Sequence, residues 1–230
     1  MSTPILPPPG GPTLRHSGSF REAPTTCRAI LGRMTETSHV EDLAGACVQA
    51  VHNALKLELD FTQDTLPILD HYARMATGPR EEILGLVAPM LGAYFGEVVR
   101  RSLGPARWHA PAEEPPEWRL EFETFFLHLN PVGVAVEAIL QRDVEGWGAN
   151  LTVLDRDRKA VNDAVELYGD VDEDDYYRFA VRFEVLEQVV RTLETRALER
   201  GEKPVHFGPE VYAAAALDAE AARSKDEKPN

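Results

Sequence analysis

The chain has few cysteines and no apolar stretch long enough to cross a membrane. Its two cysteines, Cys27 and Cys47, do not indicate a disulfide framework, and we interpret both as reduced thiols of a cytoplasmic protein. The longest apolar run extends from Ile83 to Gly96 and contains Pro89. It is shorter than the roughly 20 residues that a membrane helix needs, so it predicts a buried helix.

Positive charge is also scarce. The 24 lysines and arginines face 38 aspartates and glutamates, which gives a net charge of −14. Such a surface repels phosphate groups, so binding to nucleic acid or to an anionic membrane surface is not expected. With nucleic acid and membranes disfavoured, the expected partner is a protein.

Motifs that build common active sites are missing. The sequence has no HExxH, no GxSxG, no GxGxxG and no GxxxxGK[ST] pattern, so we expect no metal site, no nucleotide site and no cofactor. No secretion signal is predicted, because the first forty residues contain "PILPPPGGP" where such a signal would need an apolar segment.

The acidic run "GDVDEDDYYRF" resembles a calcium loop only in part. Asp170, Asp172 and Asp174 alternate, but Asp175 stands at the sixth position where a glycine is needed, and Val181 stands at the twelfth instead of glutamate. We interpret the run as the start of a helix capped by Asp174 or Asp175.

Composition divides the chain into three parts. Residues 1–38 are rich in Pro, Gly, Ser and Thr and are predicted to be disordered. Residues 39–201 are predicted to form a single domain, and residues 202–230 a short helix and a disordered tail. Because "MTETSHVEDLAGACVQAVHNAL" looks more like the beginning of a folded protein than the residues after Met1 do, Met34 is a candidate for the true start in place of Met1.

Within the domain the apolar residues follow two periods. A period of 3.6 predicts helices over residues 40–55, 63–77, 79–104, 131–141, 156–168 and 175–200, and a short helix is expected beyond the domain over 209–222. Alternation predicts strands over 106–110, 117–123, 124–130 and 150–154. The expected fold class is therefore α+β, with helices on one face of a small antiparallel sheet and a long C-terminal amphipathic helix over 175–200.

The segment "VAPMLGAYFGEVVRRSLG" places one carboxylate, Glu97, in an apolar helix. Arg100 and Arg101 lie three and four residues further on, and Trp108 follows at the start of a strand. A buried carboxylate must find partners or its pKa rises. Glu97 is therefore expected to tether the helix to the sheet, and the alternative is a general acid with a raised pKa.

Two other groups of residues are candidates for function. His109 and His128 fall on predicted strands, where either could act with Glu97 in catalysis. Arg100, Arg101 and Arg107, with Trp108, form the most concentrated positive feature and could bind a carboxylate or phosphate. The same arginines are also typical of a helix C-terminus, which favours positive charge.

Residues 59–62 (LDFT), 92–98 (GAYFGEV) and the pair Gly104 and Trp108 form a recognisable pattern. It resembles the LD[FY][ST]…GAYxGEV…GxxW pattern of a family of small uncharacterised bacterial domains, with three residues instead of two between Gly104 and Trp108. The resemblance covers about residues 43–130. It implies an accessory or immunity-type role in bacteria and no established activity.

Two functions follow as hypotheses. The first is a bacterial, non-catalytic protein-binding module of accessory, regulatory or immunity-like type. The second is a hydrolase that uses Glu97 with a nearby histidine and Arg100 and Arg101. A binding module should present an exposed apolar patch with an acidic rim, whereas an enzyme needs a pocket into which Glu97 opens.

Overall fold

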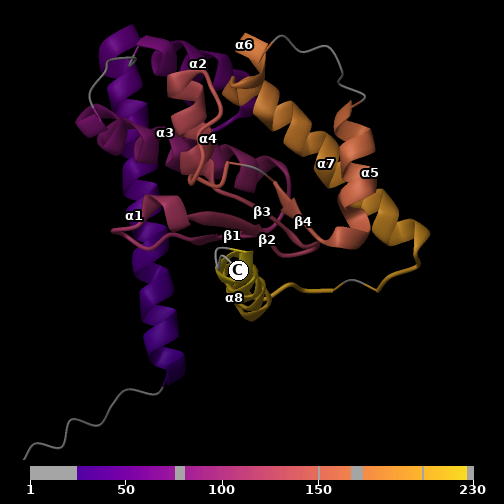
Figure 1. Cartoon of the computed structure of the whole chain (residues 1–230). Coiled ribbons are helices and arrows are strands. Elements are labelled where there is room, and N and C mark those ends of the chain that lie inside the picture. The colour runs from indigo at the N-terminus through magenta and orange to yellow at the C-terminus, as the bar shows by residue number, and fades with distance from the viewer. Residues whose placement is uncertain (1–24, 76–80, 150, 167–172, 204, 227–230) are drawn as a thin grey trace, which may run out of the picture.

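The computed structural model describes residues 25–75, 81–149, 151–166, 173–203 and 205–226. Figure 1 shows the whole chain. The elements are, in order, α1 (Thr25–Leu55), η1 (Gln63–Thr65), α2 (Leu66–Met75), α3 (Glu81–Ser102), β1 (Ala106–His109), η2 (Pro115–Glu117), β2 (Arg119–Phe122), β3 (Leu127–Leu129), α4 (Pro131–Leu140), β4 (Thr152–Val153), α5 (Asp155–Glu166), α6 (Glu173–Tyr176), α7 (Phe179–Glu199) and α8 (Pro209–Asp226).

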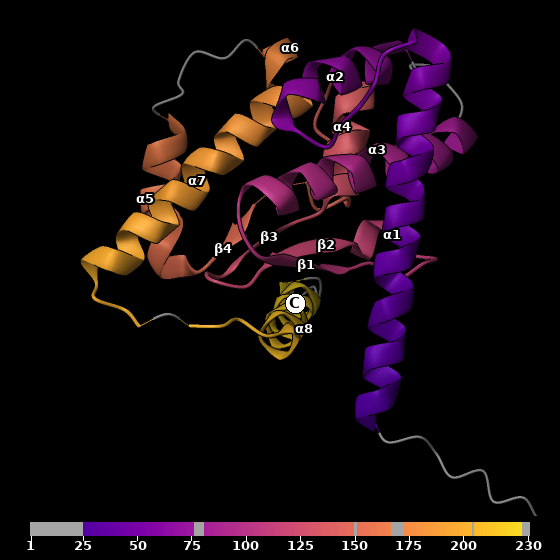
Figure 2. The same ribbon diagram turned by 180° about the vertical axis from the view of Figure 1, so that it is seen from behind.

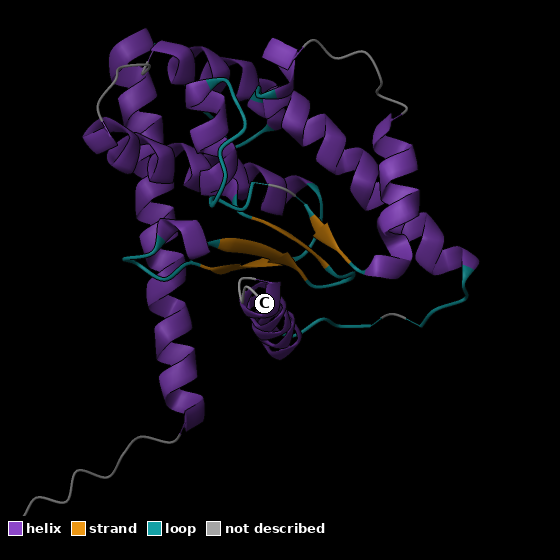
Figure 3. Ribbon diagram, in the orientation of Figure 1, coloured by secondary structure: helices purple, strands orange, loops and turns teal. Residues whose placement is uncertain are grey.

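The four strands form one antiparallel sheet in the order β1-β2-β3-β4 (Figure 3). All four predicted strands are therefore confirmed, although each is shorter than expected. One row across the sheet pairs Arg107 with Glu121 and Glu121 with His128, which in turn pairs with Thr152. Because side chains alternate along a strand, these four residues share one face of the sheet.

The other face of the sheet belongs to the core. Trp108, Leu120 and Leu129 are buried there, under α3 and α4. Figures 1 and 2 show α8 on the opposite side of the sheet from α3 and α4. The predicted α+β class is confirmed, with one correction. Helices cover both faces of the sheet, because α8 lies over the polar row.

The start of α4 forms as its sequence predicts. The side chain of Asn130 accepts hydrogen bonds from the backbone N–H groups of Val132 and Gly133, and Pro131 occupies the first turn. This end of α4 lies directly on α3. A Cβ added to Gly92 would be 2.6 Å from the Cα of Val132, so only a glycine allows this approach.

Helix α1 begins much earlier than predicted. It starts at Thr25, so residues 25–38, which composition assigned to a disordered tail, continue the helix expected from about residue 40. Figures 1 and 2 show this first half of α1 projecting beyond the sheet. The second half packs on the core through Val40, Ala44, Cys47 and Val51. Residues 1–24 and 227–230 of the predicted tails lie outside the described residues.

The helix expected over residues 175–200 is divided into α6 and α7. Helix α7 begins at Phe179, and its first N–H groups are bound by a residue of α2. The carboxylate of Asp70 accepts from Phe179 N at 2.6 Å and from Ala180 N at 3.3 Å. The prediction that Asp174 or Asp175 caps this helix is therefore wrong for α7. The buried Asp70, which is distant in the sequence, binds the first N–H groups instead.

The described helices differ from membrane spans. In the part of the chain that the structure describes, none of them has both the length and the apolar character needed to cross a bilayer.

Candidate functional site

Glu97 lies at the end of α3 in a dense set of hydrogen bonds. Its side chain is only 1% exposed. Arg100 donates to both carboxylate oxygens, from Nε at 2.9 Å and from Nη2 at 2.8 Å. The indole Nε1 of Trp108 donates to Oε1 at 2.9 Å, and Nε of Arg101 lies 3.4 Å from Oε2. Glu97 therefore ties α3 to β1.

These partners decide the ionisation of Glu97. Burial alone would raise its pKa, but the hydrogen bonds from Arg100 and Trp108 and the positive charges of Arg100 and Arg101 together lower it. Glu97 is thus ionised at neutral pH. This contradicts the prediction of a general acid with a raised pKa and agrees with the expected tether.

A glycine makes this tether possible. A Cβ added to Gly96 would lie 2.1 Å from Cη2 of Trp108 and 3.1 Å from Cγ of Pro131. The indole therefore lies across the backbone of α3, which brings its N–H to Glu97. The expectation that the glycines of this helix leave room for a neighbouring element is confirmed at Gly92 and Gly96.

The two halves of the LDFT…GAYFGEV pattern meet in space. The hydroxyl of Tyr94 accepts from Phe61 N at 2.9 Å and lies 2.8 Å from Oγ1 of Thr65. The ring of Phe61 packs on Tyr94, and the guanidinium of Arg101 lies 4.0 Å from the centre of the same Phe61 ring. The residues of the pattern thus form a packed structural unit.

The structure does not bring Glu97 together with either candidate histidine. His109 follows Trp108 on β1 and so faces the other side of the sheet. His128 packs against the rings of Phe126 and Tyr212 on that side, and burial, with the charge of Arg119, lowers its pKa to about 4. The catalytic grouping proposed from the sequence is therefore not formed.

The predicted arginine cluster is divided between two places. Arg100 and Arg101 bind Glu97, whereas Arg107 lies on the polar face of the sheet. There its Nε is 3.0 Å from Oε2 of Glu121, and its Nη1 donates to the backbone oxygen of Phe207 at 2.7 Å. Each arginine is engaged inside the molecule, so the three do not form a single binding patch with Trp108.

Tyr212 holds α8 on the polar face. Its hydroxyl donates to the backbone oxygen of Phe122 at 2.6 Å and accepts from Leu127 N at 3.2 Å. The ring stacks on Phe126 with 4.6 Å between ring centres. One side chain thus joins the last described helix to the connection between β2 and β3.

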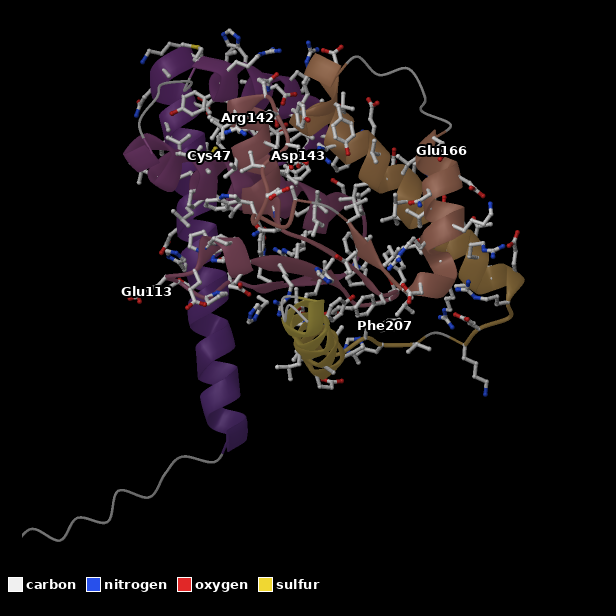
Figure 4. The ribbon with its side chains drawn as sticks, viewed as in Figure 1. Cys47, Glu113, Arg142, Asp143, Glu166 and Phe207 are labelled. Carbon is white, nitrogen blue, oxygen red and sulfur yellow. The ribbon has the colours of Figure 1, made fainter. Side chains whose placement is uncertain are left out.

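A groove lies beside this anchor, and we call it the linker groove. It has a volume of about 400 Å³ and lies between the end of α7, the α7–α8 connection, the start of α5 and the connections that follow α3 and β2. Its lining is Leu103, Gly104, Pro105, Thr124, Phe125, Phe126, Leu154, Arg156, Asp157, Leu193, Glu194, Ala197, Leu198, Arg200, Glu202, Lys203, Val205 and Phe207. Figure 4 labels Phe207 beside α8.

The linker groove exposes apolar side chains. Leu198 is 80% exposed and Val205 is 52% exposed. Charged residues of both signs surround them, and several bind one another, as Arg200 does with Asp157 and Glu202. The rim is therefore mixed in charge, whereas the sequence hypothesis expected it to be acidic.

A second buried glutamate was not recognised in the sequence. Glu137 on α4 is 2% exposed, and Nη2 of Arg182 on α7 donates to it. Burial raises the pKa of Glu137 to about 7, and a hydrogen bond with Asp143 acts in the same direction, against the charge of Arg182. The sequence did contain one indication that Glu137 is unusual, because it is the single charged residue in the apolar segment "PVGVAVEAIL".

Among the described residues, no three His, Cys, Asp or Glu side chains are arranged to hold a metal ion. No family model, curated protein or solved structure matches the chain.

Proposed function

We propose that this chain is a cytoplasmic, non-catalytic protein-binding module, of the accessory, regulatory or immunity-like kind found in bacteria, and that its partner binds in the linker groove. The observation that carries the proposal is the exposure of Leu198 and Val205 on one apolar groove. Exposed apolar side chains that gather at one place are typical of protein interaction sites.

The shape and charge of the groove fit a protein partner. Its lining combines apolar residues with charged residues of both signs, and protein interfaces likewise combine apolar contacts with polar ones. The partner is expected to insert an apolar side chain beside Leu198. The arrangement does not support the hydrolase alternative, because Arg100 and Trp108 bind the carboxylate of Glu97 and the two candidate histidines lie on the other face of the sheet.

A pair of exposed leucines gives the test. Leu198→Asp places a charge in the groove, and Leu86→Asp places the same charge on α3, outside the groove. Leu86 is 66% exposed, so neither substitution disturbs the core. Proteins captured from the native cell with each tagged variant are identified by mass spectrometry, and the recovered partner is then titrated against the purified variants.

The wild type and Leu86→Asp should bind the same partner with equal affinity, and Leu198→Asp should bind it at least tenfold more weakly. Equal binding by the two variants would show that the groove is not the interface. Failure of the wild type to capture any protein would overturn the proposed function itself.

A further inference from the structure

A second cavity lies away from the linker groove, between β4, α5 and α7. Its volume is about 530 Å³, within the range of about 300 to 1,000 Å³ that is typical of small-molecule sites. Most of its lining is apolar: Phe95, Leu129, Val134, Ala149, Leu151, Val153, Val161, Val165, Val185 and Leu186. Such a lining suits the apolar body of a ligand.

The polar lining comes from Thr152 on β4 and from α5, α6 and α7. Arg158, Asn162 and Glu166 lie on α5, Tyr176 ends α6, and Arg182 lies on α7. Glu166 is labelled near the end of α5 in Figure 4. Of the charged residues in the lining two are arginines and one is a glutamate. Arg158 is paired with Asp155, so Arg182 is the cation on which an anionic group of the ligand would bind.

Arg182 supplies a hydrogen-bond donor that is not used. Its Nη1 donates to the hydroxyl of Tyr176 at 2.9 Å, and its Nη2 donates to Glu137. Its Nε is buried and has no hydrogen-bond partner among the described residues. Buried donors are normally paired, so an acceptor at this position would complete the arrangement.

The ion pair with Glu137 does not fully balance the positive charge of Arg182. Because burial raises the pKa of Glu137 to about 7, part of the Glu137 population is protonated at neutral pH. The positive charge of Arg182, whose side chain is 11% exposed, is then only partly balanced. A ligand carboxylate would supply both the missing charge and the missing acceptor.

We propose that this cavity binds a small amphipathic carboxylate, such as a medium-chain fatty acid. Its chain lies against the apolar lining, and its carboxylate accepts the hydrogen bond from Nε of Arg182. The site is separate from the linker groove, so it stands or falls independently of the proposed protein partner.

Isothermal titration of the full chain with decanoate tests the proposal, with decanol and acetate as comparison ligands. Decanoate should bind saturably with one molecule per chain. Decanol, which keeps the chain but lacks the charge, and acetate, which keeps only the charge, should each bind at least tenfold more weakly. Absence of saturable decanoate binding, or equal binding of decanol, would overturn the assignment.

Three variants locate the site. Val161→Phe fills the apolar lining and leaves Arg182 in place, and the double substitution Arg182→Gln with Glu137→Gln removes both charges of the pair together. Each should weaken decanoate binding at least tenfold. Arg191→Gln, on the exposed side of α7, should leave it unchanged. Unchanged affinity in Val161→Phe, in a variant shown by circular dichroism to be folded, would also overturn the proposal.

Discussion

Glu97 and Glu137 occupy similar positions and behave in opposite ways. Each is a buried glutamate on an apolar helix with an arginine beside it, yet the pKa of Glu97 is lowered and that of Glu137 is raised to about 7. Glu97 receives two hydrogen bonds from Arg100 and one from Trp108, whereas Glu137 pairs with Arg182 and faces the carboxylate of Asp143. Burial raises the pKa at both sites, so the number and sign of the partners account for the difference between them.

The largest expected effect is the loss of the Glu97 tether. Glu97→Gln removes the charge that holds Arg100 and Trp108, so the free energy of unfolding should fall by about 3 to 4 kcal/mol. The measurement is urea unfolding at pH 7. Glu187→Gln breaks an exposed pair with Arg191 and should cost less than about 0.5 kcal/mol. A loss below about 1 kcal/mol for Glu97→Gln would mean that the buried pair is not a tether.

The two glutamates should respond to pH with opposite signs. Glu137 has a raised pKa in the folded state, so its contribution to stability is fully present below pH 4.5 and is lost as the pH rises to about 7. The unfolding free energy of the wild type minus that of Glu137→Gln should therefore decrease by about 2 to 3 kcal/mol across this window.

The same pH series with Glu97→Gln is the matched comparison. The contribution of Glu97 should be present above pH 4.5 and be lost as the pH falls below it, because its pKa is lowered. If the contributions of Glu97 and Glu137 to the unfolding free energy changed with pH in the same direction, the opposite shifts of their pKa values would be contradicted.

The close contact at Gly96 allows the Glu97 tether to be tested through the backbone of α3. Gly96→Ala places a methyl group against the ring of Trp108 and should lower the unfolding free energy by about 2 kcal/mol. Gly45→Ala on α1 meets no atom within 4 Å and should instead be neutral or raise stability slightly. Thermal unfolding of the two variants checks the sign of each effect.

The smallest expected effect concerns Asp143. This exposed carboxylate helps to raise the pKa of Glu137, so Asp143→Asn should lower that pKa while changing stability by less than about 0.5 kcal/mol. Carboxyl-carbon NMR titration measures the pKa directly. An unchanged pKa of Glu137 would leave burial as the sole cause of its shift.

The sequence predicted the Glu97 site because its partners are close along the chain. Arg100 and Arg101 are one helical turn away, and Trp108 begins the next strand. The alternation of "EWRLEFE" likewise predicted β2, because one face of that strand is buried and the other is polar.

Contacts between residues that are distant in sequence could not be predicted in this way, because no spacing along the chain indicates them. Arg182 lies 45 residues from Glu137, and Asp70 lies 109 residues from the N–H group of Phe179 that it binds. The break between α6 and α7 escaped prediction because the apolar period continues through it. Periodicity shows which face of a helix is buried, but tertiary contacts decide where the helix begins.

The anchor at Tyr212 has a consequence for the order in which the protein matures. All four strands are complete in the chain by Val153, but the side chain that joins α8 to the sheet comes much later. During synthesis the strands emerge from the ribosome before residues 209–226, so the polar face of the sheet stays open until α8 has been made. We expect the docking of α8 through Tyr212 to follow the pairing of the strands when the protein folds in the cell.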